Sequence, residues 1–254
     1  MQERLLRLPI YVNSSSKNRL KKFFGDQKSD SISNSPLIFF LYKNYRSHKS
    51  ILEIPSKLFY DGLLEECGDR QTLDRLSQWN LLPSSKGTGG THFPLLLIGV
   101  NGTHQHDQNS PSFYNVKEIE EVVRVCASLT SKVKPKEIGV IAAFRQQVLK
   151  LRLALRAANL SNINVGSVED FQGQEIAVII ISTVLSALPH SFLSRSIRKQ
   201  TPLLGLIGDR RRFNVAVTRG MSLCVIVGQP DVLYSDSYWR ELIEYIDSNG
   251  SLLK

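Results

Sequence analysis

The sequence predicts an α/β fold in which a mostly parallel sheet is covered by helices on both faces. Apolar stretches of strand length alternate with stretches of about 10–15 residues that have helical spacing. The strand candidates are continuous apolar runs, which is typical of parallel strands buried on both sides. With 254 residues, 42% of them hydrophobic, the chain is long enough to bury a substantial core.

The first 50 residues predict a linker followed by the start of a domain. Residues 1–35 are basic, polar and rich in Ser and Lys, apart from a short amphipathic helix expected at 1–12. Residues 36–42 are an apolar run of strand length, and residues 50–60 have the spacing of a helix. We therefore expect a polar segment at 1–35 and one domain at 36–254.

The regular alternation begins near residue 94. Strands are predicted at 94–100, 137–142, 162–166, 176–184 and 223–228, and helices at 115–130, 145–158, 209–219 and 237–247. A long loop is expected at 185–207. In open parallel sheets ligands bind outside the carboxyl ends of the strands, so we expect ligand contacts at that edge.

Charge and cysteine content narrow the class of protein. Residues 1–50 carry ten Lys and Arg against three Asp and Glu, and residues 185–220 carry seven against one. Two basic patches suggest a polyanionic partner such as nucleic acid, although a solvated linker and loop would look the same.

The three cysteines are scattered, so neither a disulfide framework nor a metal site is expected. Without a signal peptide or an apolar run of about 18 residues, we expect a cytoplasmic protein with no membrane partner.

An Arg-rich motif, Arg-Arg-Arg-Phe-Asn-Val-Ala-Val-Thr-Arg-Gly, occupies 210–220. On a helix, Arg212, Ala216 and Arg219 would share a face, with the two arginines about 10 Å apart along the axis. Guanidinium groups suit phosphate oxygens. The alternative is a surface helix whose arginines only face solvent.

A second motif, Gly-Ser-Val-Glu-Asp-Phe-Gln-Gly-Gln-Glu, occupies 166–175. Ser167 and the backbone N–H groups of this turn are candidates to hold a nucleic-acid phosphate. Glu175 or Glu169 is a candidate acceptor for a ribose hydroxyl, as acidic residues are in other nucleotide sites. The alternative is a polar turn anchored by a buried Phe171.

Two further junctions carry weaker signals. In Asn-Tyr-Arg-Ser-His at 44–48, Tyr45 is suited to stack on a base while Arg46 reaches phosphate. Residues Ala142, Ala143, Phe144 and Arg145 lead from a strand into a helix N-terminus, where free N–H groups bind anions. Taken singly, these are an ordinary surface pair and an ordinary strand–helix junction.

In this order the motifs resemble the second RecA-like domain of superfamily 1 helicases of the 5′→3′ group. The resemblance is strongest to the Armitage / Moloney-leukaemia-virus-10-type RNA helicases of RNA silencing. It extends from residue 1 to about 250 and includes Ile-Leu-Glu-Ile-Pro-Ser-Lys-Leu-Phe-Tyr-Asp-Gly and Asn-Ser-Pro-Ser-Phe-Tyr-Asn. It implies a RecA-like three-layer fold of the P-loop NTPase superfamily, in the domain that lacks the P-loop.

The resemblance also implies roles for single residues. Tyr45 would stack on adenine, Arg46 would reach the phosphates, and Glu175 would bind the ribose. Gln172 and Gly173 belong to the motif that couples ATP to RNA. Arg219 would be an arginine finger with Arg212 nearby. The RNA backbone would be contacted at Ser167, Ala142, Ala143 and Phe144, beside Arg145.

The implied partners are single-stranded RNA, a first RecA-like domain and proteins of RNA silencing, in the cytoplasm or in ribonucleoprotein granules. ATP and Mg²⁺ would serve the full-length protein. Because no Gly-x-x-x-x-Gly-Lys-Ser/Thr loop occurs in the chain, we expect a fragment without ATPase activity that binds neither ATP nor Mg²⁺ tightly. Residues 1–35 would be the remnant of the link to the missing domain.

The chain departs from the family pattern in three places. Lys49 stands where Pro is usual, Ala142-Ala143-Phe144 where Ser/Thr-Pro-Tyr is usual, and Gly220 where Ala is usual, so we expect a looser helix end there. The alternative function is a non-enzymatic RNA-binding or regulatory module, in which the face of Tyr45, Arg46, Arg212 and Arg219 would be covered or remodelled. A Rossmann oxidoreductase is excluded because no Gly-x-Gly-x-x-Gly follows a strand.

Overall fold

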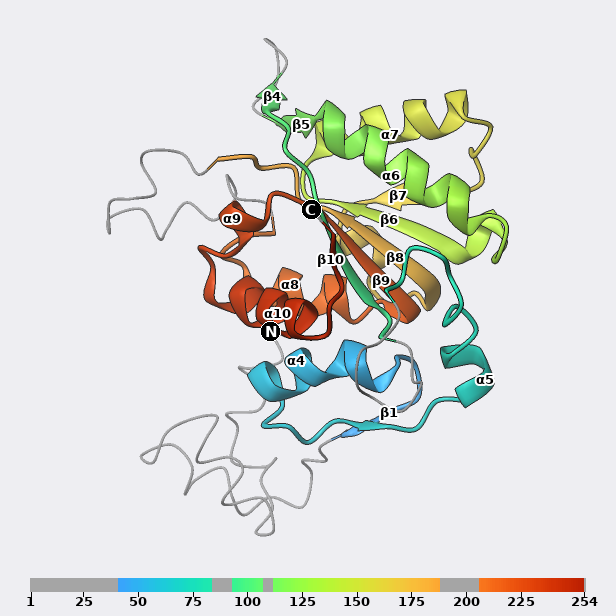
Figure 1. The fold of residues 1–254 in the computed structure, drawn as a ribbon, viewed down its shortest axis with the longest axis vertical. Helices are drawn as coiled ribbons and strands as arrows, with labels where there is room; N and C mark the ends of the chain where they lie inside the picture. The colour runs from blue at the N-terminus through green and yellow to red at the C-terminus, as the bar shows by residue number, and fades with distance from the viewer. Residues whose placement is uncertain (1–40, 84–92, 107–111, 188–205, 254) are drawn as a thin grey trace, which may run out of the picture. The chain divides into compact units, whose positions relative to one another are not determined.

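A computed structural model describes residues 41–83, 93–106, 112–187 and 206–253 (Figure 1). The chain divides into two units, Met1–Tyr42 and Lys43–Lys254, and every described helix and strand belongs to the second. The segment 1–35, most of the predicted strand 36–42 and most of the loop 185–207 lie outside the described residues.

A six-stranded sheet forms the centre of the domain, and all of its neighbouring strands run parallel. The strand order is β10-β3-β9-β8-β6-β7. The strands are β3 (Leu95–Gly99), β6 (Ile138–Ala142), β7 (Asn164–Gly166), β8 (Ile176–Ser182), β9 (Gly220–Gly228) and β10 (Leu252–Leu253). β8 and β9 are central and almost wholly buried, which explains why they are continuous apolar runs in the sequence.

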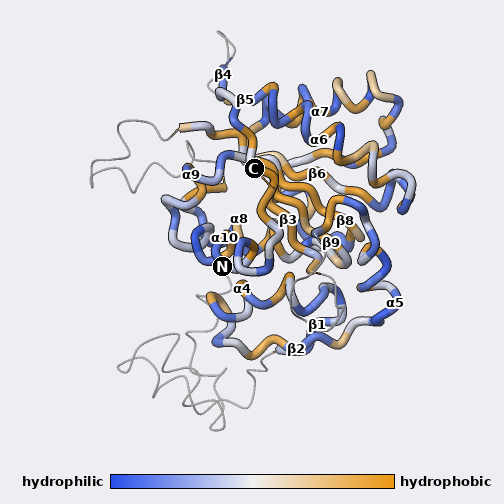
Figure 2. The backbone as a smooth tube through the Cα atoms, in the orientation of Figure 1, coloured by the Kyte–Doolittle hydropathy of each residue, from blue (hydrophilic) through white to orange (hydrophobic). Residues whose placement is uncertain are grey.

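Helices cover both faces of this sheet (Figure 1). Val178 and Ile180 of β8 pack with α6 (Val116–Leu129) and α7 (Arg145–Ala157). Ile179 and Ile181 face the opposite core, which includes α4 (Lys49–Phe59), α8 (Arg210–Val217) and α10 (Ser237–Ser248). Figure 2 shows the hydrophobic residues concentrated on the central strands. The predicted three-layer α/β architecture is confirmed.

Side-chain caps explain where several helices begin. The Asn115 side chain accepts hydrogen bonds from the N–H groups of Lys117 and Glu118 at the start of α6. Asp209 and Asp236 cap α8 and α10 in the same way. Each cap satisfies donors that the first helical turn leaves without partners.

The structure contains short elements that the sequence patterns do not predict. They are the parallel pair β1 (Lys43–Asn44) and β2 (Glu65–Glu66), the antiparallel pair β4 (His104–His106) and β5 (Phe113–Asn115), the short helices α5 (Arg70–Leu73) and α9 (Pro230–Leu233), the 3₁₀ turns η3 (Pro135–Glu137) and η4 (Glu169–Phe171), and β10. Most are too short for a hydrophobic period to be visible.

One predicted boundary is wrong and matters for the site. Helix α8 ends at Val217 with Thr218 as its C-cap, so Arg219 lies beyond the helix. Gly220 opens strand β9 and does not belong to a helix, so the expected loosening of a helix end does not apply. A Cβ atom at Gly220 would lie 2.8 Å from the Leu223 carbonyl oxygen, so close packing against the backbone favours glycine at this position.

Candidate functional site

The loop at 44–48 is fixed by its own hydrogen bonds. The Asn44 Oδ1 atom accepts from the N–H groups of Arg46 and Ser47, each at 2.9 Å. The His48 N–H donates to the Met221 carbonyl at 3.0 Å, which attaches the loop to β9. Tyr45 is left 68% exposed at the tip of this loop. The ring is therefore available to stack on a flat ligand.

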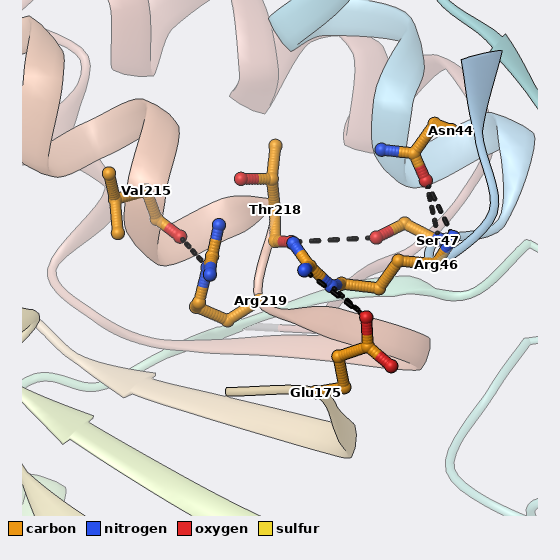
Figure 3. A network of polar contacts seen from close by, with 7 residues as sticks. All are labelled: Asn44, Arg46, Ser47, Glu175, Val215, Thr218 and Arg219. Carbon is orange, nitrogen blue, oxygen red and sulfur yellow. Dashed lines mark hydrogen bonds and ion pairs between the residues drawn. The ribbon is translucent and has the colours of Figure 1, made fainter. Parts of the chain in front are cut away.

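Arg46 meets Glu175, the residue directly before β8 (Figure 3). The Nη2 and Nε atoms of Arg46 lie 3.3 and 3.4 Å from Glu175 Oε1. The Arg46 side chain is 25% exposed and the Glu175 carboxylate 60% exposed. The pair is therefore open to solvent on the carboxylate side, where a ligand hydroxyl has access.

Arg219 lies beside this pair, directly before β9 (Figure 3). Its Nε atom donates to the Val215 carbonyl at 3.2 Å, so the last turn of α8 orients the guanidinium. Burial, and then the like charge of Arg46, lower the pKa of Arg219. Because the ordinary pKa of an arginine lies far above neutral pH, Arg219 stays protonated there. Two guanidinium groups beside one carboxylate make this a site suited to a multiply charged anion.

Tyr45, Arg46, Glu175 and Arg219 gather at the amino ends of β8 and β9. These candidate residues therefore lie at the edge opposite to the carboxyl edge, where the sequence predicts ligand contacts. The physical reason is that the loop at 44–48 docks on the start of β9, while the turn before β8 approaches from the same edge. Helix α8 returns the chain to this edge as well.

Arg212 does not share a helix face with Arg219 as predicted, because α8 ends between them. The Nε atom of Arg212 donates instead to Glu169 Oε1 at 2.8 Å, across 43 residues of sequence. The Arg212 and Glu169 side chains are 39% and 53% exposed. Arg212 therefore belongs to a neighbouring ion pair that also fixes the turn at 166–175.

The turn at 166–175 is anchored and internally bonded. Phe171 is fully buried, as the alternative interpretation of this motif predicted. The Ser167 N–H and hydroxyl both donate to Asp170 Oδ2, at 2.8 and 3.1 Å. A phosphate at Ser167 would need Asp170 to release these donors, because two anions repel each other at that distance.

The tip of this turn is open. Gln172 and Gly173 are exposed, and Gly173 has φ +84°, a conformation that favours glycine. A Cβ atom there would meet no atom within 4 Å, so the requirement for glycine is conformational. These two residues lie between the buried Phe171 and the exposed Glu175 in the sequence.

The predicted RNA-contacting residues lie at the opposite edge of the sheet. Ala142 ends β6, and the Ala143 N–H donates to the Ser182 carbonyl at the end of β8 at 3.2 Å. Because Glu175 and Ser182 are seven residues apart on one strand, the two edges are about 20 Å apart. Phe144 is buried against Phe113, so a ligand would meet its backbone and the exposed Arg145.

The N-terminus of α7 is partly capped. The Gln146 N–H donates to the Ser112 hydroxyl at 3.1 Å, which removes one donor from the predicted anion site. Phe144, the N-cap residue, makes no side-chain cap. The remaining attraction for an anion comes from the helix end and from the Arg145 guanidinium.

Sequence reasoning missed a buried polar network next to this edge. The Glu118 carboxylate, fully buried, accepts from the Ser182 hydroxyl at 2.6 Å and from the Val184 N–H at 2.9 Å. Burial raises the pKa of Glu118 to about 7. Gln147 donates to Ser182 Oγ at 2.8 Å. A glutamate three residues after the Asn115 cap is the signal that would have pointed to it, because it lies on the inward face of α6.

The described residues show neither a metal-binding cluster nor a membrane-spanning helix. Among them, three or more His, Cys, Asp or Glu side chains do not gather in a way that would hold a metal ion. No helix within the described ranges is long and apolar enough to cross a membrane.

The six-stranded parallel sheet with helices on both faces defines an α/β domain of the RecA type. The AAA domain family model matches residues 27–231, and the chain belongs to that family. The resemblance to the C-terminal RecA-like domain of Armitage-type superfamily 1 RNA helicases is confirmed.

Three relatives indicate the range of similarity. RNA helicase Mov10l1 of Mus musculus is 41% identical over 254 residues, which is 98% of this chain and 20% of the relative. The putative helicase mov-10-B.2 of Danio rerio is 39% identical over 241 residues, 89% of this chain and 22% of that protein. The probable RNA helicase armi of Drosophila melanogaster is 33% identical over 216 residues, which is 83% of this chain and 18% of that protein. The chain thus spans about a fifth of the length of these relatives.

A solved structure is a more distant neighbour. The C-terminal domain of a possible DNA helicase from a Lactobacillus species matches with a TM-score of 0.40 and 13% identity, covering 73% of this chain and 88% of that one. At this distance the likeness carries no argument about the site.

Proposed function

We propose that this chain forms the second RecA-like domain of an ATP-dependent RNA helicase that acts in RNA silencing or RNA decay. In this proposal it supplies an arginine finger and RNA contacts to a first domain that carries the P-loop. The observation that supports it best is the convergence of Arg46, Glu175 and Arg219, which come from three distant segments, at one edge of the sheet.

The residues present fit part of a nucleotide site. An exposed tyrosine suits the adenine ring, an open carboxylate suits a ribose hydroxyl, and two arginines suit phosphate oxygens. The chain has no loop to cradle the β- and γ-phosphates, and its described residues offer no carboxylate cluster for Mg²⁺. ATP and Mg²⁺ would therefore be held mainly by the first domain.

The orientation of Arg219 supports a role as the finger. The carbonyl of Val215 orients its Nε atom, so the two terminal amino groups are left to contact a γ-phosphate. The neighbouring Arg46 pairs with the carboxylate of Glu175, and its like charge lowers the pKa of Arg219, so phosphate charge would relieve the repulsion between the two arginines. Hydrolysis would then depend on Arg219, while Arg46 would contribute mainly to binding.

The two edges of the sheet suggest how ATP and RNA are linked. The amino edge carries the nucleotide residues, and the carboxyl edge carries Ala142 to Arg145. Strand β8 connects them, because Glu175 precedes it and Ser182 ends it. In this proposal Gln172 and Gly173, at the open turn before β8, transmit nucleotide-dependent movement toward RNA.

The exposure of the amino-edge residues supports the helicase domain over the non-enzymatic module. Such a module would have the face of Tyr45, Arg46, Arg212 and Arg219 covered or remodelled. Instead Tyr45 is largely exposed and the three arginines are partly exposed. The module hypothesis remains as one outcome of the experiment below.

The test is a chimera in which this chain replaces the matching C-terminal segment of mouse Mov10l1. We expect RNA-stimulated ATP hydrolysis by the chimera and a fall in kcat of about 10³-fold or more for Arg219→Ala, the usual effect of losing such a finger. Arg240→Ala, an arginine-to-alanine change on α10 away from the site, is the matched control and should leave kcat unchanged.

Two results would contradict the proposal. One is an active chimera in which Arg219→Ala keeps its kcat. The other is RNA-stimulated ATP turnover by the purified 254-residue chain alone. A chimera that binds RNA, retains its fold and never hydrolyses ATP would favour the non-enzymatic RNA-binding or regulatory module.

A further inference from the structure

Val184, just beyond the end of β8, has a backbone conformation that a β-branched residue rarely adopts. Its φ is +76°, and the Leu185 N–H donates to the Thr183 carbonyl at 3.0 Å, closing a three-residue γ-turn. Such turns persist where the surrounding structure holds them in place. Strained turns of this kind gather at functional sites.

Both polar backbone groups of Val184 are held by the start of α6. Its N–H lies 2.9 Å from each oxygen of the Glu118 carboxylate. Its carbonyl accepts from Asn115 Nδ2 at 3.2 Å. Glu118 and Asn115 are buried, so water does not compete for these bonds. The buried carboxylate is thus the main group that keeps the turn closed.

The same carboxylate reaches the predicted RNA edge through Ser182. The Ser182 hydroxyl donates to Glu118 at 2.6 Å and accepts from Gln147 Nε2 at 2.8 Å. Gln147 lies in the first turn of α7, two residues after Arg145. The Ser182 carbonyl accepts from the Ala143 N–H. Glu118 therefore influences both the strand end and the helix start that flank Ala143.

On its other side the turn leads to the β4–β5 pair. Ser186, two residues after Val184, donates its N–H to His104 Nδ1 at 3.2 Å. The Ser186 hydroxyl accepts from the His104 N–H at 2.9 Å. The direction in which the chain leaves β8 thus sets the position of β4 against this edge.

We propose that Glu118 is a positioning residue for RNA binding, which holds the Val184 turn closed and thereby sets the β6–α7 junction and β4 in the arrangement that receives the RNA backbone. The inference rests on the proposed function, since it assumes that this edge contacts RNA. The RNA contacts themselves are made by the exposed Arg145 and by backbone N–H groups of the junction, which suit phosphate of any sequence.

A rescue experiment tests this inference in the full 254-residue chain. The probe is a fluorescein-labelled single-stranded oligouridylate at low salt, with binding followed by fluorescence anisotropy. We expect Glu118→Ala to raise Kd about tenfold, the scale of losing one hydrogen bond to a charged group. Glycine adopts positive φ without support, so Glu118→Ala/Val184→Gly should recover most of that loss.

Three further variants make the result specific. Glu120→Ala removes an exposed glutamate of the same helix and should leave Kd unchanged. Val184→Gly alone should bind nearly as the parent chain does. Glu118→Gln keeps the volume of the side chain and one acceptor oxygen, so its Kd should lie between those of the parent chain and Glu118→Ala. This variant preserves the test if the alanine variant fails to fold. Circular dichroism gives the folded fraction by which each Kd is corrected.

The outcomes separate this inference from the proposed function. If the parent chain binds RNA and the folded Glu118 variants bind with the same Kd, the positioning role is overturned while the proposed function stands. If glycine at 184 restores stability without restoring binding, Glu118 does not act on RNA binding through the Val184 turn, and the inference is again overturned. If the parent chain does not bind RNA, the RNA contacts of the proposed function fail and the inference falls with them.

Discussion

Arg46 and Glu175 form an ion pair that joins residues 129 positions apart in the sequence, with 3.3 Å between Arg46 Nη2 and Glu175 Oε1. The pair brings a guanidinium, which suits phosphate oxygens, together with a carboxylate, which suits a ligand hydroxyl. Because Glu175 is largely exposed, the pair adds little to stability and is free to rearrange around a ligand.

Replacing Glu175 by Gln should therefore separate binding from folding. We expect the free energy of unfolding to change by less than about 1 kcal/mol, the usual limit for an exposed ion pair. In the chimera, the KM for ATP should rise because the amide is a weaker acceptor for a ribose hydroxyl. Urea titration measures the free energy of unfolding, and steady-state kinetics measure the KM for ATP. Unchanged KM would remove Glu175 from the nucleotide site.

The Arg212–Glu169 pair allows a charge-swap test. Both side chains are substantially exposed, so Arg212→Glu/Glu169→Arg should keep the unfolding free energy within about 1 kcal/mol of the parent. If Arg212 contacts phosphate, the swap should still lower ATP hydrolysis by the chimera, because the cation has moved. Full activity in the swapped chimera would mean that Arg212 serves only to fix the turn at 166–175.

Stability should fall as pH rises through the range where Glu118 loses its proton. Its pKa is about 7 in the folded chain against 4.5 ordinarily, so the folded state holds the proton more tightly than the unfolded state. The stabilising contribution is complete below about pH 4.5 and is lost by about pH 7, and it amounts to roughly 3 kcal/mol.

Other carboxylates titrate in the same range, so the comparison must be with Glu118→Gln. The difference between the two unfolding curves, measured by urea titration from pH 4.5 to 8, isolates Glu118. We expect the parent chain to lose stability relative to the variant as pH rises. A flat difference would mean that the carboxylate is ionised at little cost throughout.

Gly139→Ala should destabilise the fold at the anchor of the turn at 166–175. An added Cβ would lie 2.6 Å from Phe171 Cε1 and 2.9 Å from Ile179 Cδ1. Crowding of this kind in a packed core costs about 1–3 kcal/mol. Phe171→Leu in the same chain should recover part of the loss by removing the ring. Thermal unfolding measures both, and an alanine variant as stable as the parent would contradict this packing.

Much of the fold could be predicted because its signals are local. The apolar run of β8 and the inward spacing of α6 identify a strand and a helix wherever they lie in space. Short elements such as β4 and β10 could not be found, since two or three residues carry no period. The helix predicted at 209–219 ends two residues earlier, at Val217, in the structure. Arg219 therefore lies directly before strand β9 and not on a helix face.

The sequence by itself determined that this is a parallel α/β domain with helicase motifs at Tyr45–Arg46, 166–175 and 210–220, because hydrophobic period and motif order are properties of neighbouring residues. Only the tertiary structure decided the partners of the charged groups: Glu175 for Arg46, Glu169 for Arg212 and the Val184 turn for Glu118. These pairings depend on β8 lying between β6 and β9. Strand order arises from long-range packing, so no local pattern in the chain specifies it.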